Sequence, residues 1–222
     1  MLAPRPGSIG IMGGTFDPIH LGHLAIAAHT QAALGLERIL FIPAGSPPHK
    51  PLDSVSPAHD RVAMVRLAIA DRPGFELSTL EVDRPGPSYT ADTVAALEER
   101  ERAAGRTPDL TLILSDETFR DLPGWHEPER LLATCRMAVV QRPGYPAPDR
   151  SWLAAQAPGA QGRVDFLEGP RLDISSTSIR KLVAEGRSIR GLVPPAVDRY
   201  VAEHHLYRPP NSSESQGRTS TP

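Results

Sequence analysis

The sequence has little cysteine, few aromatic residues and almost no net charge over its 222 residues. Its single cysteine, Cys135, excludes a disulfide within the chain and is typical of a protein from a reducing compartment. Cys135 lies in an apolar segment, so we expect a buried structural thiol and assign it no catalytic role. The 24 basic and 26 acidic residues leave a formal net charge of −2, which provides no global field to attract nucleic acid or an anionic membrane.

Long apolar runs are missing as well. A membrane-spanning helix needs about eighteen consecutive apolar residues, which do not occur, and residues 1–8 lack the apolar core of a signal peptide. We therefore expect a cytoplasmic protein without nucleic-acid or membrane partners, and the composition leaves room for a homo-oligomer. The organisation that we expect is a flexible segment over 1–8, one domain over 9–207, and a disordered tail over 208–222, where almost nothing is apolar.

Short apolar, β-rich runs alternate with helical patterns along the chain. This alternation is typical of a parallel sheet covered on both faces, so we expect a doubly wound, Rossmann-like α/β domain. The predicted strands are 9–12, 39–42, 75–79, 110–114, 137–140 and 164–167. The predicted helices are 21–34, 57–70, 91–104, 129–133, 176–185 and 195–204. In such a sheet, ligands bind beyond the carboxyl ends of the strands.

The most informative segment is residues 13–23, Gly-Gly-Thr-Phe-Asp-Pro-Ile-His-Leu-Gly-His. It joins a predicted strand to a predicted helix, and glycines before a helix N-terminus let a phosphate approach the backbone N–H groups. His20 and His23 project from one side of the first helical turn and can donate to the same phosphate chain. Two alternatives are that His20 and His23 are a solvated surface pair or that they are two metal ligands. For the metal site, no further cysteine or histidine pair at ligand spacing supplies the remaining ligands.

Two further segments carry groups that suit phosphate. Residues 42–50 follow the second predicted strand, and a proline pair there fixes the direction of Lys50 toward the same sheet edge; an exposed lysine without a partner is the alternative. Residues 173–180, Asp-Ile-Ser-Ser-Thr-Ser-Ile-Arg, place four hydroxyl groups and Arg180 at a predicted helix start. Ser175 is expected to cap that helix with help from Ser178, while the other hydroxyls and Arg180 form an anion cradle.

Residues 84–93, Arg-Pro-Gly-Pro-Ser-Tyr-Thr-Ala-Asp-Thr, also end at a predicted helix start. We expect Thr90 to be the N-cap, and the backbone N–H groups there would suit a carboxylate. Helix capping without a ligand is the alternative. Trp125 lies in a predicted loop, where an exposed indole suits a ligand ring better than the core, whereas Trp152 has a helical pattern and is assigned to the core.

The segment 13–23 resembles the GGTFDP-x-H-x-GH signature of the nucleotidyltransferase superfamily, most closely that of the bacterial nicotinate mononucleotide adenylyltransferases. The segments PPHK, SYTxDT, RPGY and ISSTxIR resemble further motifs of this family, and the matches extend from about residue 9 to 207. The resemblance implies transfer of AMP from ATP to nicotinate mononucleotide, giving deamido-NAD and pyrophosphate. It also implies Mg²⁺ held mainly by the ATP phosphates, with no metal ligand from the protein.

The resemblance assigns roles to individual residues. Catalytic roles are implied for His20, His23, Lys50 and Arg180. ATP contacts are implied for Gly13, Gly14, Thr15, Phe16, Gly22, Ser115, Glu117, Ile174, Ser175, Ser176 and Thr177. Acceptor contacts are implied for Ser88, Tyr89, Thr90, Trp125 and Arg142, with the indole stacked on the nicotinate ring.

One triplet departs from the family pattern. Counted back from Leu122 and Trp125, the family's Gly-Ala-Asp falls on Ser115-Asp116-Glu117, unless Asp116 takes the place of the aspartate by a shift of one residue. That aspartate lies near the adenosine ribose in the family, so we expect the change to affect ATP affinity more than catalysis. Three alternatives stay open: another acceptor such as nicotinamide mononucleotide, a tRNA-binding synthetase-like protein, and an ATP-binding regulator without turnover.

Overall fold

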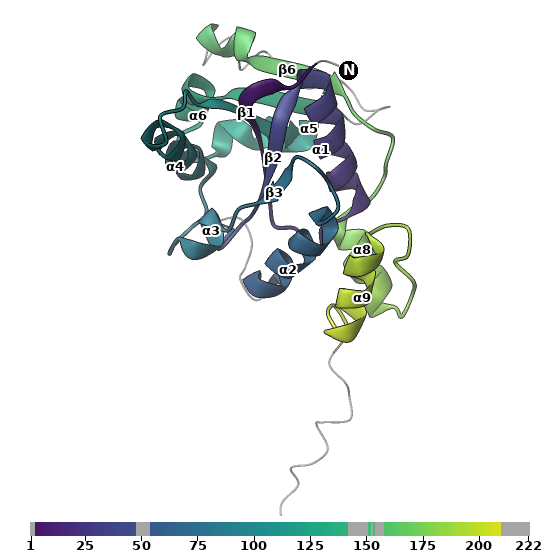
Figure 1. Cartoon of the computed structure of the whole chain (residues 1–222). Coiled ribbons are helices and arrows are strands. Elements are labelled where there is room, and N and C mark those ends of the chain that lie inside the picture. Colours follow the sequence, from purple (N-terminus) through teal and green to yellow (C-terminus); the bar gives the residue numbers. More distant parts are fainter. Residues whose placement is uncertain (1–2, 48–53, 142–150, 152, 154–157, 210–222) are drawn as a thin grey trace, which may run out of the picture.

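Six parallel strands form one twisted sheet at the centre of the molecule (Figure 1). The structure is a computed structural model that describes residues 3–47, 54–141, 151, 153 and 158–209. The strands are β1 (Arg5–Gly14), β2 (Leu36–Pro43), β3 (Phe75–Leu77), β4 (Asp109–Ser115), β5 (Arg136–Gln141) and β6 (Val164–Glu168). Their order is β3-β2-β1-β4-β5-β6, and every neighbouring pair is parallel. The predicted doubly wound α/β fold is confirmed.

Side chains of the central strands alternate between two hydrophobic clusters because successive residues of a strand point to opposite faces. On β4, Leu110, Leu112 and Leu114 enter one cluster, while Ile113 enters the other. On β5, Met137 and Val139 join the first cluster, and the small Ala138 joins the second. Both faces of the sheet are therefore buried, which explains the continuous apolar runs of these strands.

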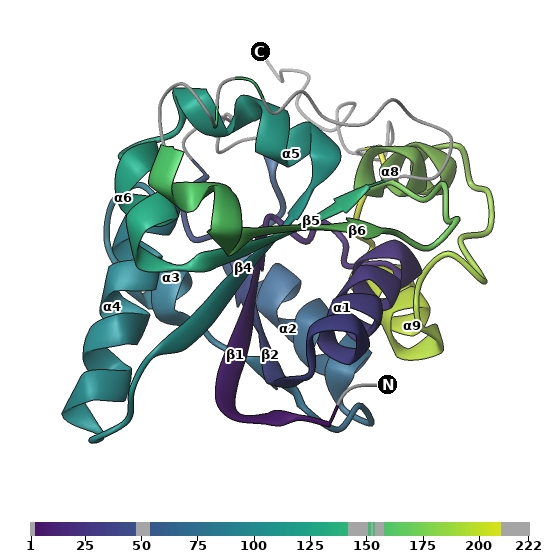
Figure 2. The ribbon, with the colours of Figure 1, turned by 90° about the horizontal axis from the view of Figure 1, so that it is seen from above.

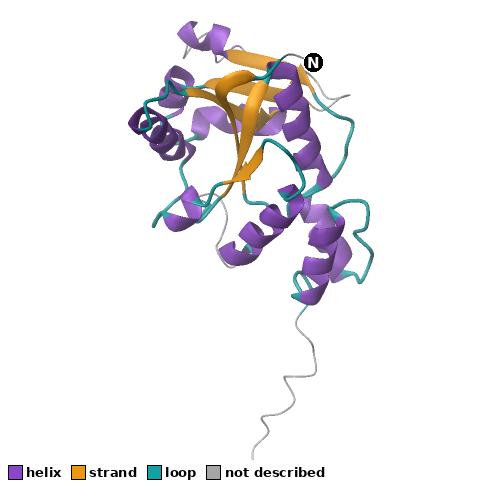
Figure 3. Cartoon of the chain, in the orientation of Figure 1, coloured by secondary structure: helices purple, strands orange, loops and turns teal. Residues whose placement is uncertain are grey.

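Helices cover both faces of the sheet (Figures 2 and 3). One face carries α1 (Leu21–Leu34), α2 (Ala58–Ile69), α8 (Ser176–Ala184) and α9 (Pro195–Glu203). The other carries α4 (Thr90–Ala103), α5 (Asp116–Asp121), α6 (Pro128–Thr134) and the short 3₁₀ segments η2 (Leu122–Gly124) and η3 (Pro158–Arg163). The four-residue helix α3 (Leu80–Asp83) follows β3. Within the described residues, no helix has the length and apolar composition needed to cross a membrane.

Three local expectations differ from the structure. The first strand begins at Arg5 rather than at residue 9, so part of the segment expected to be flexible pairs within the sheet, and Ser8 is fully buried. Thr90 is the first residue of α4 and not its cap, because Tyr89 occupies the N-cap position in an extended conformation. The short helices α3 and α5 were not predicted. The tail expected over 208–222 lies almost entirely outside the described residues.

The strand order changes direction between β1 and β4. The chain winds outward from β1 through β2 to β3, and then crosses to β4 on the other side of β1 and continues to β6. At such a switch point the connections leaving the two adjacent strands separate, which opens a crevice at their carboxyl ends. The turn over residues 13–20, which leaves β1, therefore lies at the place where this fold accommodates a ligand.

Cys135 provides a test of the core around α6. It is 2% exposed, its thiol donates to the Leu131 carbonyl at 3.4 Å, and burial raises its pKa to about 12. Because the thiolate is the reactive form, we predict that Cys135 of the folded chain does not react with an aromatic disulfide reagent at about pH 8. The same titration in guanidinium chloride should detect one thiol per chain. Rapid reaction of the folded chain would contradict this picture of the core.

Candidate active site

The turn between β1 and α1 brings the predicted phosphate site to the switch point. Gly14 ends β1, and its carbonyl accepts from the Ala44 N–H at 2.9 Å, which ties the turn to the end of β2. His20 is the N-cap of α1, with φ −141° and ψ 171°. An N-cap of this extended conformation directs the side chain back over the free N–H groups of the first helical turn.

His20 and His23 cap the helix reciprocally. The His23 N–H donates to Nδ1 of His20 at 3.4 Å, and the His20 N–H donates to Nδ1 of His23 at 3.3 Å. The two rings stack with centroids 3.7 Å apart and an interplanar angle of 23°. This is a capping box in which imidazoles replace the usual hydroxyl and carboxylate. Since both Nδ1 atoms accept, each neutral ring carries its proton on Nε2.

The surroundings keep His23 neutral. Burial lowers the pKa of His23 well below 6.5, and the neighbouring His20 lowers it further. The buried Phe16 ring meets His23 edge-on, with centroids 5.1 Å apart. A neutral His23 can donate one hydrogen bond to a phosphate through Nε2. The attraction for the anion's charge then comes mainly from the N-terminus of α1.

The start of α8 meets the same turn. Ser175 is the N-cap of α8 as predicted, and its Oγ accepts from the Ser178 N–H at 3.1 Å. Ser176 Oγ donates to the Pro18 carbonyl at 2.9 Å, across 158 residues of sequence. Arg180 Nη1 donates to the Asp17 carbonyl at 2.7 Å. The two phosphate motifs are therefore joined by hydrogen bonds, and two helix N-termini lie beside one another.

A cavity of about 540 Å³ lies between these helix starts and the ends of the central strands. Its volume falls within the range of small-molecule sites. Most of the described residues predicted to be catalytic or to bind ATP or the acceptor line it: Gly13, Gly14, Thr15, His20, Gly22, His23, Ser88, Thr90, Ser115, Trp125, Ile174, Ser175 and Ser176. Segments separated by more than 150 residues in the chain thus form one wall.

Other predicted residues lie outside this wall. Phe16 belongs to the core behind His23, and the Tyr89 ring packs on His126 with centroids 4.3 Å apart. Thr177 is exposed, and Arg180 is directed to the turn over residues 15–18. Lys50 and Arg142 lie outside the described residues, so their roles stay predictions.

Residues 115–117, which depart from the family pattern, lie at the start of helix α5. Ser115 is the N-cap, and its Oγ accepts from the Thr118 N–H at 3.2 Å. Asp116 is 1% exposed and pairs with Arg120 at 3.2 Å, whereas Glu117 is exposed. Ser115 and Thr118 line the cavity, and neither acidic residue does. The ribose contact expected of Glu117 stays a prediction that this placement does not support.

Ser88 shapes another part of the cavity wall. Its Oγ accepts from the N–H groups of Gly45 and Ser46 at 2.9 and 3.1 Å, which joins the loop after β2 to the segment before α4. Gly45 also allows this loop to lie against α3, because a Cβ there would lie 2.2 Å from the Glu81 carbonyl oxygen. The hydroxyl of Ser88 is thus engaged in shaping the wall as well as facing the cavity.

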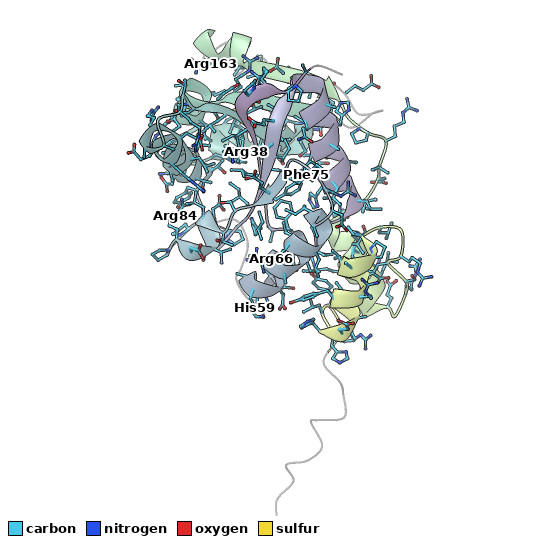
Figure 4. All side chains as sticks on the ribbon, in the orientation of Figure 1. Arg38, His59, Arg66, Phe75, Arg84 and Arg163 are labelled. Carbon is cyan, nitrogen blue, oxygen red and sulfur yellow. The ribbon has the colours of Figure 1, made fainter. Side chains whose placement is uncertain are left out.

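Glu81 is a cavity residue that the sequence analysis missed. It is 6% exposed and accepts from Thr93 Oγ1 at 2.7 Å. Burial raises the pKa of Glu81, while Thr93, Arg84 and Ser88 act in the opposite direction. Arg84, labelled in Figure 4, donates to Thr93 Oγ1 at 3.1 Å. The signal in the sequence was weak because α3 was not predicted. Gln141, in contrast, directly follows the predicted strand 137–140 and could have been found from that position.

The donor set suits phosphate better than a protein-bound metal ion. Within the described ranges, no group of three or more His, Cys, Asp or Glu side chains is arranged to hold a metal. The cavity offers imidazole N–H groups, hydroxyl groups and helix N-termini, all of which can donate to anions.

Comparison with known proteins agrees with this geometry. The cytidylyltransferase-like family matches residues 11–182, a range that includes both phosphate motifs. A relative from Roseiflexus sp. (strain RS-1), named "Probable nicotinate-nucleotide adenylyltransferase", is 50% identical over 200 residues, covering 90% of this chain and 98% of its own. A relative of the same name from Symbiobacterium thermophilum is 46% identical over 202 residues, covering 90% and 94%. The chain belongs to the nicotinate-nucleotide adenylyltransferase family.

Solved structures share the fold of this family member. Plasmodium falciparum nicotinic acid mononucleotide adenylyltransferase complexed with NaAD matches with a TM-score of 0.74 and 20% identity, over 90% of this chain and 97% of that one. The same Plasmodium enzyme complexed with APC matches with a TM-score of 0.72 over the same shares of the two chains.

The lowered pKa of His23 predicts a pH dependence of stability. Between its folded pKa and the unfolded value near 6.5, the unfolded chain binds more protons than the folded chain, so stability should fall as the pH falls below about 6.5. Urea unfolding from about pH 8 to about pH 5.5 measures this slope. His23→Ala should flatten it, because this variant lacks the buried imidazole. Equal slopes for wild type and His23→Ala would contradict the prediction.

Proposed function

We propose that this chain transfers AMP from ATP to nicotinate mononucleotide, releasing pyrophosphate and forming deamido-NAD. The observation that carries the proposal is the convergence of two helix N-termini, those of α1 and α8, on one cavity whose wall also includes Trp125 and Thr90. The two helix starts thus suit a phosphate chain, and the part of the wall with Trp125 and Thr90 suits a flat ring with an anionic substituent. The family name of the relatives and the NaAD complex of the Plasmodium enzyme support the same assignment.

The reaction needs no covalent intermediate with the protein. An oxygen of the acceptor phosphate attacks the α-phosphorus of ATP, the bond from that phosphorus to the bridging oxygen breaks, and pyrophosphate leaves with the electron pair. His20 and His23 would donate to the phosphates through Nε2 as charge develops, together with the N-terminal backbone of α1. Their reciprocal cap holds both rings in place before the substrates arrive, which lowers the cost of reorganisation.

The outer phosphates of ATP would lie at the start of α8. Ser175 and Ser176 line the cavity there, and the N-terminus of α8 attracts negative charge. We assign Arg180 and Lys50 to the leaving pyrophosphate. Mg²⁺ entering with ATP would neutralise phosphate charge while held by phosphate oxygens and water. The single buried cysteine supports a reducing, cytoplasmic setting for the reaction.

The acceptor's carboxylate would bind at the start of α4. Thr90 is the first residue of that helix and lines the cavity, and in the described structure Tyr89 makes no side-chain capping hydrogen bond. The backbone N–H groups of the first turn of α4 can therefore donate to a ligand. The indole of Trp125 would stack on the pyridine ring. A carboxylate receives charge-assisted hydrogen bonds that a carboxamide does not.

This arrangement predicts the choice of acceptor. With ATP and Mg²⁺, kcat/KM for nicotinate mononucleotide should exceed that for nicotinamide mononucleotide by about tenfold or more, since one charge-assisted bond contributes roughly 1.5–3 kcal/mol. Pyrophosphate release gives the rates, and mass analysis identifies the dinucleotide. Equal efficiency would indicate a dual-specificity enzyme, and ATP binding without pyrophosphate release would indicate a regulator.

The role of the histidine pair is tested by His23→Ala. Removing one preorganised donor should lower kcat by about 10²-fold. His29→Ala removes an imidazole from the same helix outside the described cavity wall and should leave kcat unchanged. Circular dichroism and thermal unfolding establish that both variants fold. A His23→Ala enzyme with near wild-type kcat would exclude His23 from the mechanism.

A further inference from the structure

The turn that leads into the histidine pair is held by residues from distant parts of the chain. Arg61 Nη1 donates to the Thr15 carbonyl at 2.9 Å. The carboxylate of Asp17 accepts from the Ser56 N–H at 3.2 Å and from the Tyr207 hydroxyl at 2.7 Å. Tyr207 is 190 residues from Asp17 and lies beyond the last helix. The residues that follow α9 are therefore part of the support of the active site.

The backbone after α9 turns Tyr207 toward this site. His205 and Tyr207 both have left-handed conformations, with φ of 53° and 63°. Such conformations are uncommon for residues with side chains, and here they shape the turn over residues 204–207 that follows α9. Tyr207 also packs against the second hydrophobic cluster, and its hydroxyl lies 3.9 Å from Met64 Sδ of α2. The ring is thus held by packing while its hydroxyl reaches the turn.

The hydrogen bond of Tyr207 joins a buried group. Asp17 is 3% exposed and Arg61 is 2% exposed, and their opposite charges attract within the core. Burial, followed by the charge of Asp17, raises the pKa of Tyr207, so its hydroxyl stays a donor at every physiological pH. A buried carboxylate oxygen that loses its donor is unfavourable, and the turn would rearrange to find another.

We propose that Tyr207 is a positioning residue for nucleotidyl transfer, which holds Asp17 and thereby sets the turn that orients His20 and His23. The inference rests on the proposed function. Asp17 lies three residues before the N-cap His20, so displacement of Asp17 displaces the start of α1. The carbonyl of Asp17 also accepts from Arg180, so the same displacement reaches the start of α8. Reaction rates depend steeply on such placement, and a shift of about 1 Å can cost roughly 10²-fold.

The matched pair Tyr207→Phe and Tyr200→Phe tests this. Tyr200 donates to Asp60 Oδ1 at 2.8 Å and joins α9 to α2, so each variant loses one tyrosine–carboxylate hydrogen bond to a buried acid. Both should lose a similar amount of thermal stability. Well below the unfolding temperature, Tyr207→Phe should lower kcat by about tenfold with KM for nicotinate mononucleotide unchanged, while Tyr200→Phe should keep the wild-type kcat.

Two further measurements separate positioning from general loosening. Imidazole ¹⁵N resonances of His20 and His23 should shift in Tyr207→Phe and stay in place in Tyr200→Phe. In the double variant with Asp17→Asn, the effects on kcat should be strongly non-additive, because Tyr207 acts through Asp17. Unchanged kcat in Tyr207→Phe, equal losses in both tyrosine variants, or additive effects with Asp17→Asn would overturn the proposal. If the wild-type chain lacks turnover, the proposed function fails, and the resonances still decide whether Tyr207 orients the histidines.

Discussion

The reciprocal hydrogen bonds between His20 and His23 are the interaction on which the active site depends. They satisfy N–H groups at the start of α1, fix the orientation of both rings and place the proton of each neutral ring on Nε2. The bonds that begin the helix therefore also orient the N–H groups that we propose as donors to phosphate. Loss of either ring would disturb the helix start and, in the proposed reaction, the contact with phosphate, because each ring caps through Nδ1 and offers its N–H at Nε2.

In the proposed reaction, the site would attract phosphate through the local arrangement of its donors. Its described polar wall consists largely of neutral imidazoles, hydroxyl groups and the N-termini of α1 and α8, while the chain as a whole carries a formal charge of −2. Neutral donors keep their orientation when substrates bind and need no counter-charge in the empty state. The buried charges of Asp17, within the turn, and of Arg61, on α2, support the shape of the turn.

The elements that the sequence predicted well are those with strong local patterns. The central strands followed from continuous apolar runs, since a parallel sheet is buried on both faces, and α1 begins and ends where its pattern indicated. The prediction missed short elements because they lack such patterns. Helix α3, for example, spans four residues, which is too few for a periodic pattern. Thr90 has a good N-cap side chain, yet α4 begins one residue earlier than that preference suggested, because packing of the helix outweighs a single cap.

The sequence by itself determined where the six strands and the longer helices follow one another along the chain, the capping serine of α8 and the histidine motif after β1. Each of these depends on residues close together in the chain. Only the tertiary structure decided which of these residues share a cavity. It brought Glu81 into the wall, left Glu117 exposed outside it, and carried Tyr207 to Asp17. Contacts across 190 residues depend on how the helices pack against the sheet, and no local pattern of side chains encodes that packing.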